Sequence, residues 1–233
     1  MHCIEDIKVI RHKGDKMGEI FKIAIDGPGG AGKSTIAKAV AKKLDIDYID
    51  TGAMYRALGL KMMNLNMKIE DGEELRKLLT ETEIDFKNGD IFLDGQVVSH
   101  LIRTPEVSMA ASNVSAFPVV RKHMVAAQQK MGESKSVIMD GRDICTDVFP
   151  DAEYKYFVTA DAKERAMRRY KELLEKGQNA VYEQVLADIE QRDYNDSTRA
   201  ASPLKKAEDA ELIDTTNMTI DEVVNYICDK VKA

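Results

Sequence analysis

A short apolar segment ending at Asp26 leads directly into the glycine-rich run GPGGAGKST, residues 27–35, after which the chain takes on a helical pattern. The run fits G-x-x-x-x-G-K-[ST], with Lys33 and Ser34 at its end. Glycines let the backbone fold so that N–H groups point at a phosphate, and the helix that follows presents its N-terminus to the same anion. The sequence therefore predicts a strand, a phosphate-binding loop and a helix, with a nucleoside triphosphate as ligand.

Further strand and helix patterns alternate along the chain, which indicates an α/β fold with a parallel sheet covered on both faces. The five predicted strands are residues 19–26, 47–50, 136–143, 152–160 and 210–216. Ligands of such sheets bind beyond the carboxyl ends of the strands. The polar turns after Asp26, Asp50 and Asp140 all fall at predicted carboxyl ends, so we expect the site there.

One stretch, residues 82–102, breaks this alternation. It contains Asn88-Gly89 and Asp94-Gly95 between short apolar alternations, and both dipeptides are hairpin signals. We expect a small antiparallel insert that stands apart from the parallel sheet. The pattern leaves two interpretations open, a structural decoration and a substrate-binding flap.

Composition restricts the class of ligand and the compartment. A net charge of −6 argues against a dedicated polyanion binder, so the phosphates of a nucleotide must meet locally placed arginines. The three cysteines, Cys3, Cys145 and Cys228, are few and far apart, which favours a reducing compartment. We find no run apolar enough for a membrane span and no secretory segment, and we expect a cytoplasmic protein.

Arginine distinguishes this chain from other nucleotide-binding classes. A GTPase would need D-x-x-G and N-K-x-D after the loop, and neither follows Ser34. Arginines instead gather near predicted strand ends and in late helical segments: Arg56, Arg121, Arg142, Arg165, Arg168, Arg169, Arg192 and Arg199. Any one of them alone could be a solvated surface charge. Together they suit phosphoryl transfer between two anionic substrates, because guanidinium binds phosphate bidentately and never loses its proton.

In these motifs the sequence closely resembles the bacterial cytidylate kinases, which phosphorylate CMP and dCMP with ATP. The resemblance runs from about Phe21 to the C-terminus. It is carried by IDGPGGAGKST, DTGAMYR, AASNVSAFPVVR, DGRDICTDVFPDA, ERAMRRY and QRDYNDSTRAASPL. It implies a nucleoside-monophosphate kinase fold in a single domain, residues 19–233. That fold has a five-stranded parallel sheet, a β insert at about 82–102 in the monophosphate-binding region, and a short helical lid at about 165–185.

The resemblance also implies the residues that bind each substrate. The acceptor nucleotide would be bound by Thr51, Arg56, Ser112, Arg121, Arg142, Asp143, Arg192, Asp196 and Arg199. ATP would be bound by Gly27, Pro28, Gly29, Gly30, Ala31, Gly32, Lys33, Ser34 and Thr35. Residues with a catalytic role would be Lys33, Arg142, Arg199, Arg165 and Arg169, the last two as lid arginines over the ATP phosphates. Mg²⁺, the implied cofactor, would be bound by Ser34 and, through water, by Asp140.

The resemblance divides the acceptor residues by the part of the nucleotide they touch. Thr51, where many members have serine, would contact the base. Asp143 would read the cytosine, and Ser112 and Arg121 would face the cytidine moiety. The chemistry agrees, because a carboxylate accepts from the N4 amino group of cytosine while guanidinium and hydroxyl groups suit N3 and O2.

The remaining acceptor residues would serve the phosphate and the sugar. Arg56, Arg142 and Arg199 would bind the acceptor phosphate. Arg192 and Asp196 would reach the sugar. No general base is needed, because the attacking phosphate is already an anion.

Two alternatives stay open at the level of sequence. One is another small P-loop kinase, for UMP, dTMP or a non-nucleotide acceptor, and the other is an ATP-binding regulator without turnover. The partners we expect are ATP, CMP and dCMP, with no nucleic acid, no membrane, and a monomeric protein.

The first residues, 1–18, precede the family-like region and have no strong amphipathic pattern. We expect the native chain to start at Met17, so that residues 1–16 are an extension outside it. The preceding KGDK is what a purine-rich ribosome-binding site would encode if read in frame.

Overall fold

The computed structural model describes residues 20–87 and 89–232. The predictions made for residues 1–18 lie outside this part of the chain. The strands are β1 Lys22–Asp26, β2 Asp47–Asp50, β3 Ile84–Lys87, β4 Asp90–Leu93, β5 Gln96–Val97, β6 Val137–Gly141, β7 Tyr154–Thr159 and β8 Glu211–Asp214. The helices are α1 Lys33–Leu44, α2 Thr51–Asn64, α3 Glu73–Thr80, α4 Pro105–Val114, α5 Pro118–Met131, α6 Ala162–Glu175, α7 Tyr182–Thr198 and α8 Ile220–Lys232, with a 3₁₀ turn η1 Leu101–Arg103 and a π-helical turn η2 Ile144–Val148.

The main sheet has the order β2-β6-β1-β7-β8, and its strands pair in parallel. The prediction of a five-stranded parallel sheet is thereby confirmed. In the register, Asp26 lies opposite Gly141 and Asp50 lies opposite Asp140. The three turns that carry the glycine loop, the start of α2 and the DGRD segment therefore meet at one edge of the sheet.

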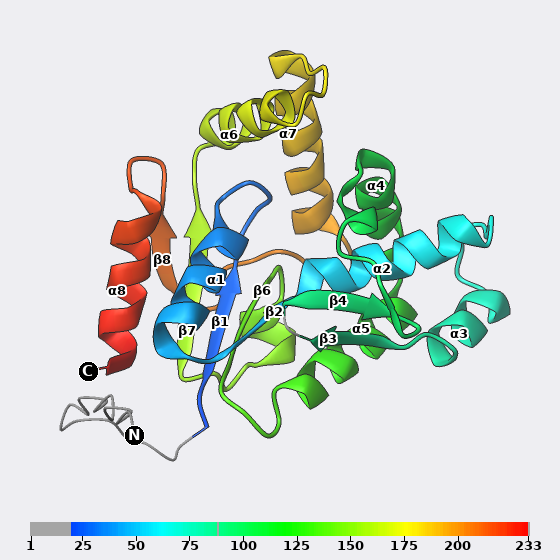
Figure 1. The fold of residues 1–233 in the computed structure, drawn as a ribbon, viewed down its shortest axis with the longest axis horizontal. Helices are drawn as coiled ribbons and strands as arrows, with labels where there is room; N and C mark the ends of the chain where they lie inside the picture. Colours follow the sequence, from blue (N-terminus) through cyan, green and yellow to red (C-terminus); the bar gives the residue numbers. More distant parts are fainter. Residues whose placement is uncertain (1–19, 88, 233) are drawn as a thin grey trace, which may run out of the picture.

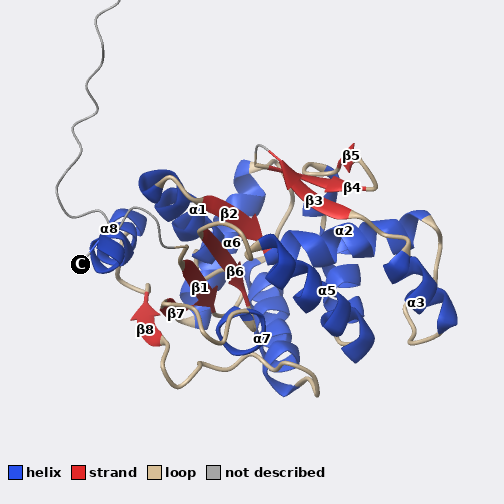
Figure 2. Ribbon diagram, turned by 90° about the horizontal axis from the view of Figure 1, so that it is seen from below, coloured by secondary structure: helices blue, strands red, loops and turns tan. Residues whose placement is uncertain are grey.

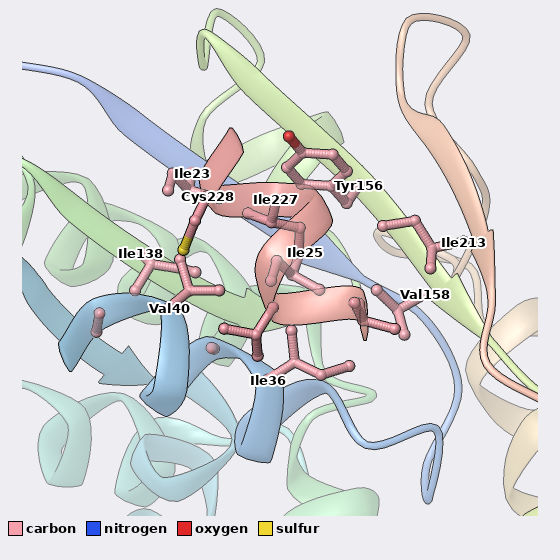
Figure 3. Packing of buried hydrophobic residues seen from close by; sticks show 14 of the residues in the cluster. Ile23, Ile25, Ile36, Val40, Ile138, Tyr156, Val158, Ile213, Ile227 and Cys228 are labelled. Carbon is pink, nitrogen blue, oxygen red and sulfur yellow. The ribbon is translucent and has the colours of Figure 1, made fainter. Parts of the chain in front are cut away.

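Both faces of this sheet are buried, as expected for a parallel sheet with nearly continuous apolar strands. Successive side chains of β1 point to opposite faces. Ile23 and Ile25 pack with α1 and α8 on one face, where Figure 3 shows Ile36, Val40 and Ile227 beside them. Ala24 belongs to the core of the other face, which η2 and α5 help to cover. This double cover holds the phosphate-binding loop on a rigid base.

The insert forms its own antiparallel sheet, β3-β4-β5, as the hairpin signals predicted. Asp94 and Gly95 both have positive φ, 50° and 79°, which is the geometry of a tight two-residue hairpin turn. In Figure 2 this small sheet lies beside α2 and away from the main sheet. Its apolar side chains pack with Ala57 and Leu60 of α2 and with Ile102 of η1.

Helices α6 and α7 cross over the carboxyl edge of the main sheet, above the loop between β1 and α1 (Figure 1). Residues 176–181 connect the two helices, within the segment predicted as a lid. Among the helices of the described residues, none is long and apolar enough to cross a membrane.

Candidate active site

The glycine loop needs glycine for steric reasons at its first position. Gly27 has φ +144°, and a Cβ placed there would lie 1.9 Å from the carbonyl oxygen of Val158 in β7. Gly32, with φ 87°, directly precedes the first residue of α1. Only glycine adopts these conformations without strain. The loop is therefore pressed against the sheet, and the N-terminus of α1 opens toward it.

Lys33 is buried at the base of this loop. Its side-chain Nζ donates to the carbonyl oxygen of Pro28 at 2.7 Å. Burial, and next the nearby Arg142, lower the pKa of Lys33 to about 7. A cation held in a desolvated site among other cations gains strongly from an incoming anion. The loop, the helix N-terminus and Lys33 together form a phosphate site.

Asp140, in β6, connects the loop to the strands beside it. One carboxylate oxygen accepts from the Tyr48 hydroxyl at 2.7 Å and the other from the Ser34 hydroxyl at 2.8 Å. Its backbone carbonyl accepts from the Thr51 hydroxyl at 2.6 Å. Burial, and next Asp50, raise the pKa of the Asp140 carboxyl. The site thus holds one carboxylate against two hydroxyl groups at the end of the sheet.

This donor set fits a magnesium ion that arrives with phosphate. Within residues 20–87 and 89–232 no group of three or more His, Cys, Asp or Glu side chains could hold a metal by itself. Mg²⁺ keeps several waters and is commonly held by one or two protein groups plus substrate phosphates. Ser34 and Asp140, joined by a hydrogen bond beside the phosphate loop, meet that description.

Asp26, the last residue of β1, joins the glycine loop to the DGRD segment. Its two carboxylate oxygens accept from the backbone N–H groups of Ile144 and Cys145, each at 2.8 Å. The side chain has no exposed surface. Burial raises the pKa of Asp26 to about 6, although both N–H bonds act in the opposite direction. Asp143 immediately precedes the two bonded N–H groups, so Asp26 fixes the turn on which Asp143 lies.

A cavity of about 200 Å³ opens between this edge and helices α2, α4 and α7. The structure brings every residue predicted for the acceptor nucleotide to its wall: Thr51, Arg56, Ser112, Arg121, Arg142, Asp143, Arg192, Asp196 and Arg199. We call it the acceptor cavity. Gly30, Lys33 and Ser34 of the glycine loop line it as well.

One wall of the acceptor cavity carries a buried ion pair. A terminal nitrogen of Arg121 donates to one carboxylate oxygen of Asp143, and the two side chains are only 4% and 6% exposed. The guanidinium of Arg121 lies 5.5 Å from the ring centre of Tyr55. The Tyr55 hydroxyl is buried without a hydrogen-bond partner among the described residues. Tyr55, Arg121 and Asp143 all line the cavity, and the ion pair uses only one of the two carboxylate oxygens of Asp143.

Another part of the lining is a group of arginines near Asp196. Arg142 donates to Asp196 at 2.7 Å, and Arg199 lies 3.7 Å from the other oxygen of Asp196. Burial, and next Arg142, lower the pKa of Arg192 to about 10. Arg142 and Arg199 both contact Asp196, and the buried Arg192 lines the same cavity, which leaves surplus positive charge for a phosphate group.

A second, larger cavity of about 680 Å³ lies on the other side of the loop, between it and the lid helix α6, and we call it the donor cavity. Its wall includes Lys33, Ser34 and Thr35 of the loop and α1, and Arg168, Arg169 and Lys176 from α6 and its end. The two cavities share six lining residues: Gly30, Lys33, Ser34, Arg56, Ser108 and Arg192. Two anions bound in them would meet beside Lys33 and Arg56.

Some predicted ATP and lid residues lie elsewhere. Gly27, Pro28 and Ala31 belong to the loop but line neither cavity. Arg169 lines the donor cavity, where it pairs with Glu172 at 2.8 Å. Arg165 lines neither cavity. Its catalytic role stays a prediction.

The contacts of Arg165 explain its position. Its guanidinium donates to the carbonyl oxygens of Ala160 and Gly29 and to a carboxylate oxygen of Asp193, at 2.8, 3.0 and 2.6 Å. It therefore ties α6, the glycine loop and α7 together, and it would have to leave these bonds to reach a phosphate.

Several side chains at this site have no role in the sequence prediction. Tyr48, Asp50 and Tyr55 surround the acceptor cavity or its carboxylates, while Arg103 and Lys176 line the donor cavity. The signal was present for Asp50, which ends a predicted strand. Arg103 directly precedes Thr104-Pro105, a helix-start pair, and so also lies at an element boundary.

A phosphate-binding loop between two cationic cavities, on a parallel sheet with a helical lid, defines a P-loop kinase that brings two anionic substrates together. The chain belongs to the cytidylate kinase family, whose sequence model matches residues 23–233.

Curated relatives agree over nearly their whole length. The cytidylate kinase of Clostridioides difficile is 52% identical over 215 residues, which cover 92% of this chain and 99% of that protein. The cytidylate kinase of Caldicellulosiruptor saccharolyticus is 53% identical, with 89% and 93% covered. That of Fusobacterium nucleatum is 47% identical, with 90% and 96% covered.

Proposed function

We propose that the protein transfers the γ-phosphoryl group of ATP to CMP or dCMP, giving ADP and CDP or dCDP. One observation carries the proposal. The acceptor cavity is lined by the polar groups of Thr51, Arg121 and Asp143 and by the arginines Arg56, Arg142, Arg192 and Arg199, and it shares Lys33 with the donor cavity. Family membership agrees with this assignment.

Cytosine fits the polar groups of Thr51, Arg121 and Asp143 in one orientation. Asp143 uses one carboxylate oxygen for Arg121, so the other is available to accept from the N4 amino group. Arg121 has further N–H donors for N3 and O2. The Thr51 hydroxyl donates its proton to the carbonyl of Asp140, so toward the base it can only accept. Uracil would place a carbonyl where these groups offer acceptors, and acceptors facing each other repel.

The phosphate end needs only positioning and charge neutralisation. Arg56, Arg142 and Arg199 would hold the acceptor phosphate in line with the γ-phosphate of ATP, and Arg192 and Asp196 would hold the sugar. The loop and Lys33 would bind the β- and γ-phosphates, with lid arginines closing over them. Mg²⁺, held by Ser34 and through water by Asp140, would neutralise charge on the transferred group. Closure of α6 and α7 would exclude water and so prevent ATP hydrolysis.

A coupled ADP-release assay tests this function. ATP, Mg²⁺ and the protein without an acceptor should release ADP slowly, and addition of CMP should raise the rate many-fold. An ATP-binding regulator would release no ADP under either condition. A kinase for a non-nucleotide acceptor would not respond to CMP.

The compartment and the oligomeric state belong to the same proposal. Cys145 and Cys228 are free thiols and both are buried, which suits a reducing compartment, and we assign the protein to the cytoplasm as a monomer. Size-exclusion chromatography with light scattering measures the oligomeric state directly.

A further inference from the structure

Arg103, at the end of η1 in the insert region, reaches the main domain through a shared carboxylate. One of its terminal nitrogens lies 3.0 Å from an oxygen of Asp50, and a terminal nitrogen of Arg56 lies 3.0 Å from that same oxygen. Asp50 is almost buried, whereas about half of the Arg103 side chain is exposed. Two guanidinium groups from different parts of the chain are thus aligned on a single oxygen atom.

This oxygen lies where the two cavities join. Asp50 lines the acceptor cavity, Arg103 lines the donor cavity, and Arg56 lines both. The three charged groups therefore form a bridge across the boundary between the two cavities. Phosphoryl transfer requires the acceptor phosphate to lie at this boundary.

The charge around the bridge is unbalanced. In the part of the chain that the structure describes, a single carboxylate, that of Glu172, lines the donor cavity. Seven cationic side chains line it as well: Lys33, Arg56, Arg103, Arg168, Arg169, Lys176 and Arg192. The Nε of Arg56 is buried and has no hydrogen-bond partner among the described residues. One carboxylate oxygen of Asp50 cannot satisfy two guanidinium groups, so both retain donors for a further anion.

We propose that Arg103 is a ligand of the acceptor phosphate and binds it together with Arg56. Asp50 orients both guanidinium groups and uses one terminal nitrogen of Arg103, which leaves the other N–H donors of its planar fork for a phosphate in the cavity that Arg103 lines. The inference rests on the proposed function, because it takes a nucleoside monophosphate as the second substrate.

This assignment gives the β insert a function. η1 and the small sheet share one apolar core, in which Ile91, Leu93 and Val98 pack with Ile102. A phosphate bound by Arg103 is therefore linked to the position of the whole insert. The insert acts as a substrate-binding flap, the second of the two interpretations that its sequence left open.

The test compares CMP with cytidine, which has the same base and sugar but no phosphate. We would measure both dissociation constants by calorimetry for the wild type, Arg103→Met and Arg103→Lys. The matched control is Arg76→Met, because Arg76 is 53% exposed and pairs with Asp71 at 2.7 Å on the surface of α3, away from both cavities. Thermal unfolding of each variant checks that the fold is retained.

Arg103→Met should weaken CMP binding by about 10- to 100-fold, the range for a hydrogen bond to a charged group, and leave cytidine binding within about twofold. Arg103→Lys keeps the positive charge but not the planar fork of the guanidinium, so its affinity for CMP should lie between those of the wild type and Arg103→Met. Arg76→Met should match the wild type for both ligands.

Two results would overturn the inference. Unchanged CMP binding in Arg103→Met would remove Arg103 from the phosphate site, and an equal loss for CMP and cytidine would reduce it to an anchor of the insert. A wild type that binds CMP no better than other monophosphates and does not phosphorylate it would instead contradict the proposed function, independently of the variants.

Discussion

Asp26 is a buried carboxylate between the phosphate loop and the turn that carries Asp143, with no ion pair among the described residues, and this predicts a characteristic pH dependence of stability. Burial raises its pKa from 3.8 to about 6 in the folded protein. The folded state therefore holds this proton at pH values where the unfolded chain has released it. The stabilising contribution is fully present below the unfolded pKa and is lost as the pH rises through about 6.

The magnitude follows from the shift. At about 1.4 kcal/mol per pKa unit, a rise of about two units corresponds to about 3 kcal/mol of unfolding free energy, most of it gained between pH 7 and pH 4. The variant Asp26→Asn does not titrate. Its amide can accept only one of the two N–H bonds from Ile144 and Cys145, but that loss does not change with pH.

Urea denaturation of the wild type and Asp26→Asn at several pH values between 4 and 7 measures this effect. The difference in unfolding free energy should shift in favour of the wild type by about 2 to 3 kcal/mol as the pH is lowered from 7 to 4. Asp209→Asn is the surface control, because the hydrogen bond from Lys155 lowers the pKa of Asp209 below its usual value of 3.8, so its difference should stay nearly constant between pH 7 and 4. A wild-type-to-Asp26→Asn difference that stays constant across this range would refute the reasoning.

Three variants test the chemistry of the site. Lys33→Ala should abolish phosphoryl transfer, because it removes a positive charge worth several kcal/mol to the transition state, and its melting temperature should stay near that of the wild type. Near-normal turnover in a folded Lys33→Ala variant would contradict the loop assignment. Asp143→Ala should raise KM for CMP and dCMP and narrow the ratio of kcat/KM between CMP and UMP, and an unchanged ratio would exclude base reading by Asp143. Tyr48→Phe removes one of the two hydroxyl donors to the Asp140 carboxylate and should weaken Mn²⁺ binding to the nucleotide complex by at least about tenfold, measured by paramagnetic resonance, for a hydrogen bond to a charged group of about 1.5 kcal/mol or more; unchanged Mn²⁺ affinity would show that Asp140 needs no such support.

The sequence predicted the parts of this molecule that local patterns determine. The glycine loop, the five parallel strands and the hairpin at Asp94-Gly95 each depend on a few adjacent residues, and the structure confirms them. The start of α2 shows the usual uncertainty at boundaries. We expected it near Ala53, whereas Asp50 caps the helix through the Ala53 N–H and the helix begins at Thr51.

Pairings between distant side chains were not predictable in the same way. Tyr48 and Asp140 are 92 residues apart, and they meet only because β2 and β6 are neighbours in the sheet. Arg103 and Asp50 are 53 residues apart and meet because the insert folds back over α2. Strand order and insert docking are set by the whole core, so sequence motifs identified candidate residues but not their partners.

Arg165 is a second case in which a sequence motif identified a candidate residue but not its contacts. The family resemblance assigned Arg165 and Arg169 of ERAMRRY to the ATP phosphates, but helical spacing alone does not say which arginines of this segment face the cavity. In the structure Arg168 and Arg169 line the donor cavity, whereas Arg165 points inward to the loop backbone and Asp193.

The central claim is that the acceptor is a cytidine nucleotide recognised through its base. The most direct measurement is kcat/KM with ATP and Mg²⁺ for CMP, dCMP, UMP and dTMP in one assay, with the diphosphate products identified by chromatography. A site built around a hydrogen bond to the N4 amino group should favour CMP and dCMP over UMP and dTMP by at least about 100-fold. Equal values for CMP and UMP, or ADP release without a cytidine diphosphate product, would contradict the account.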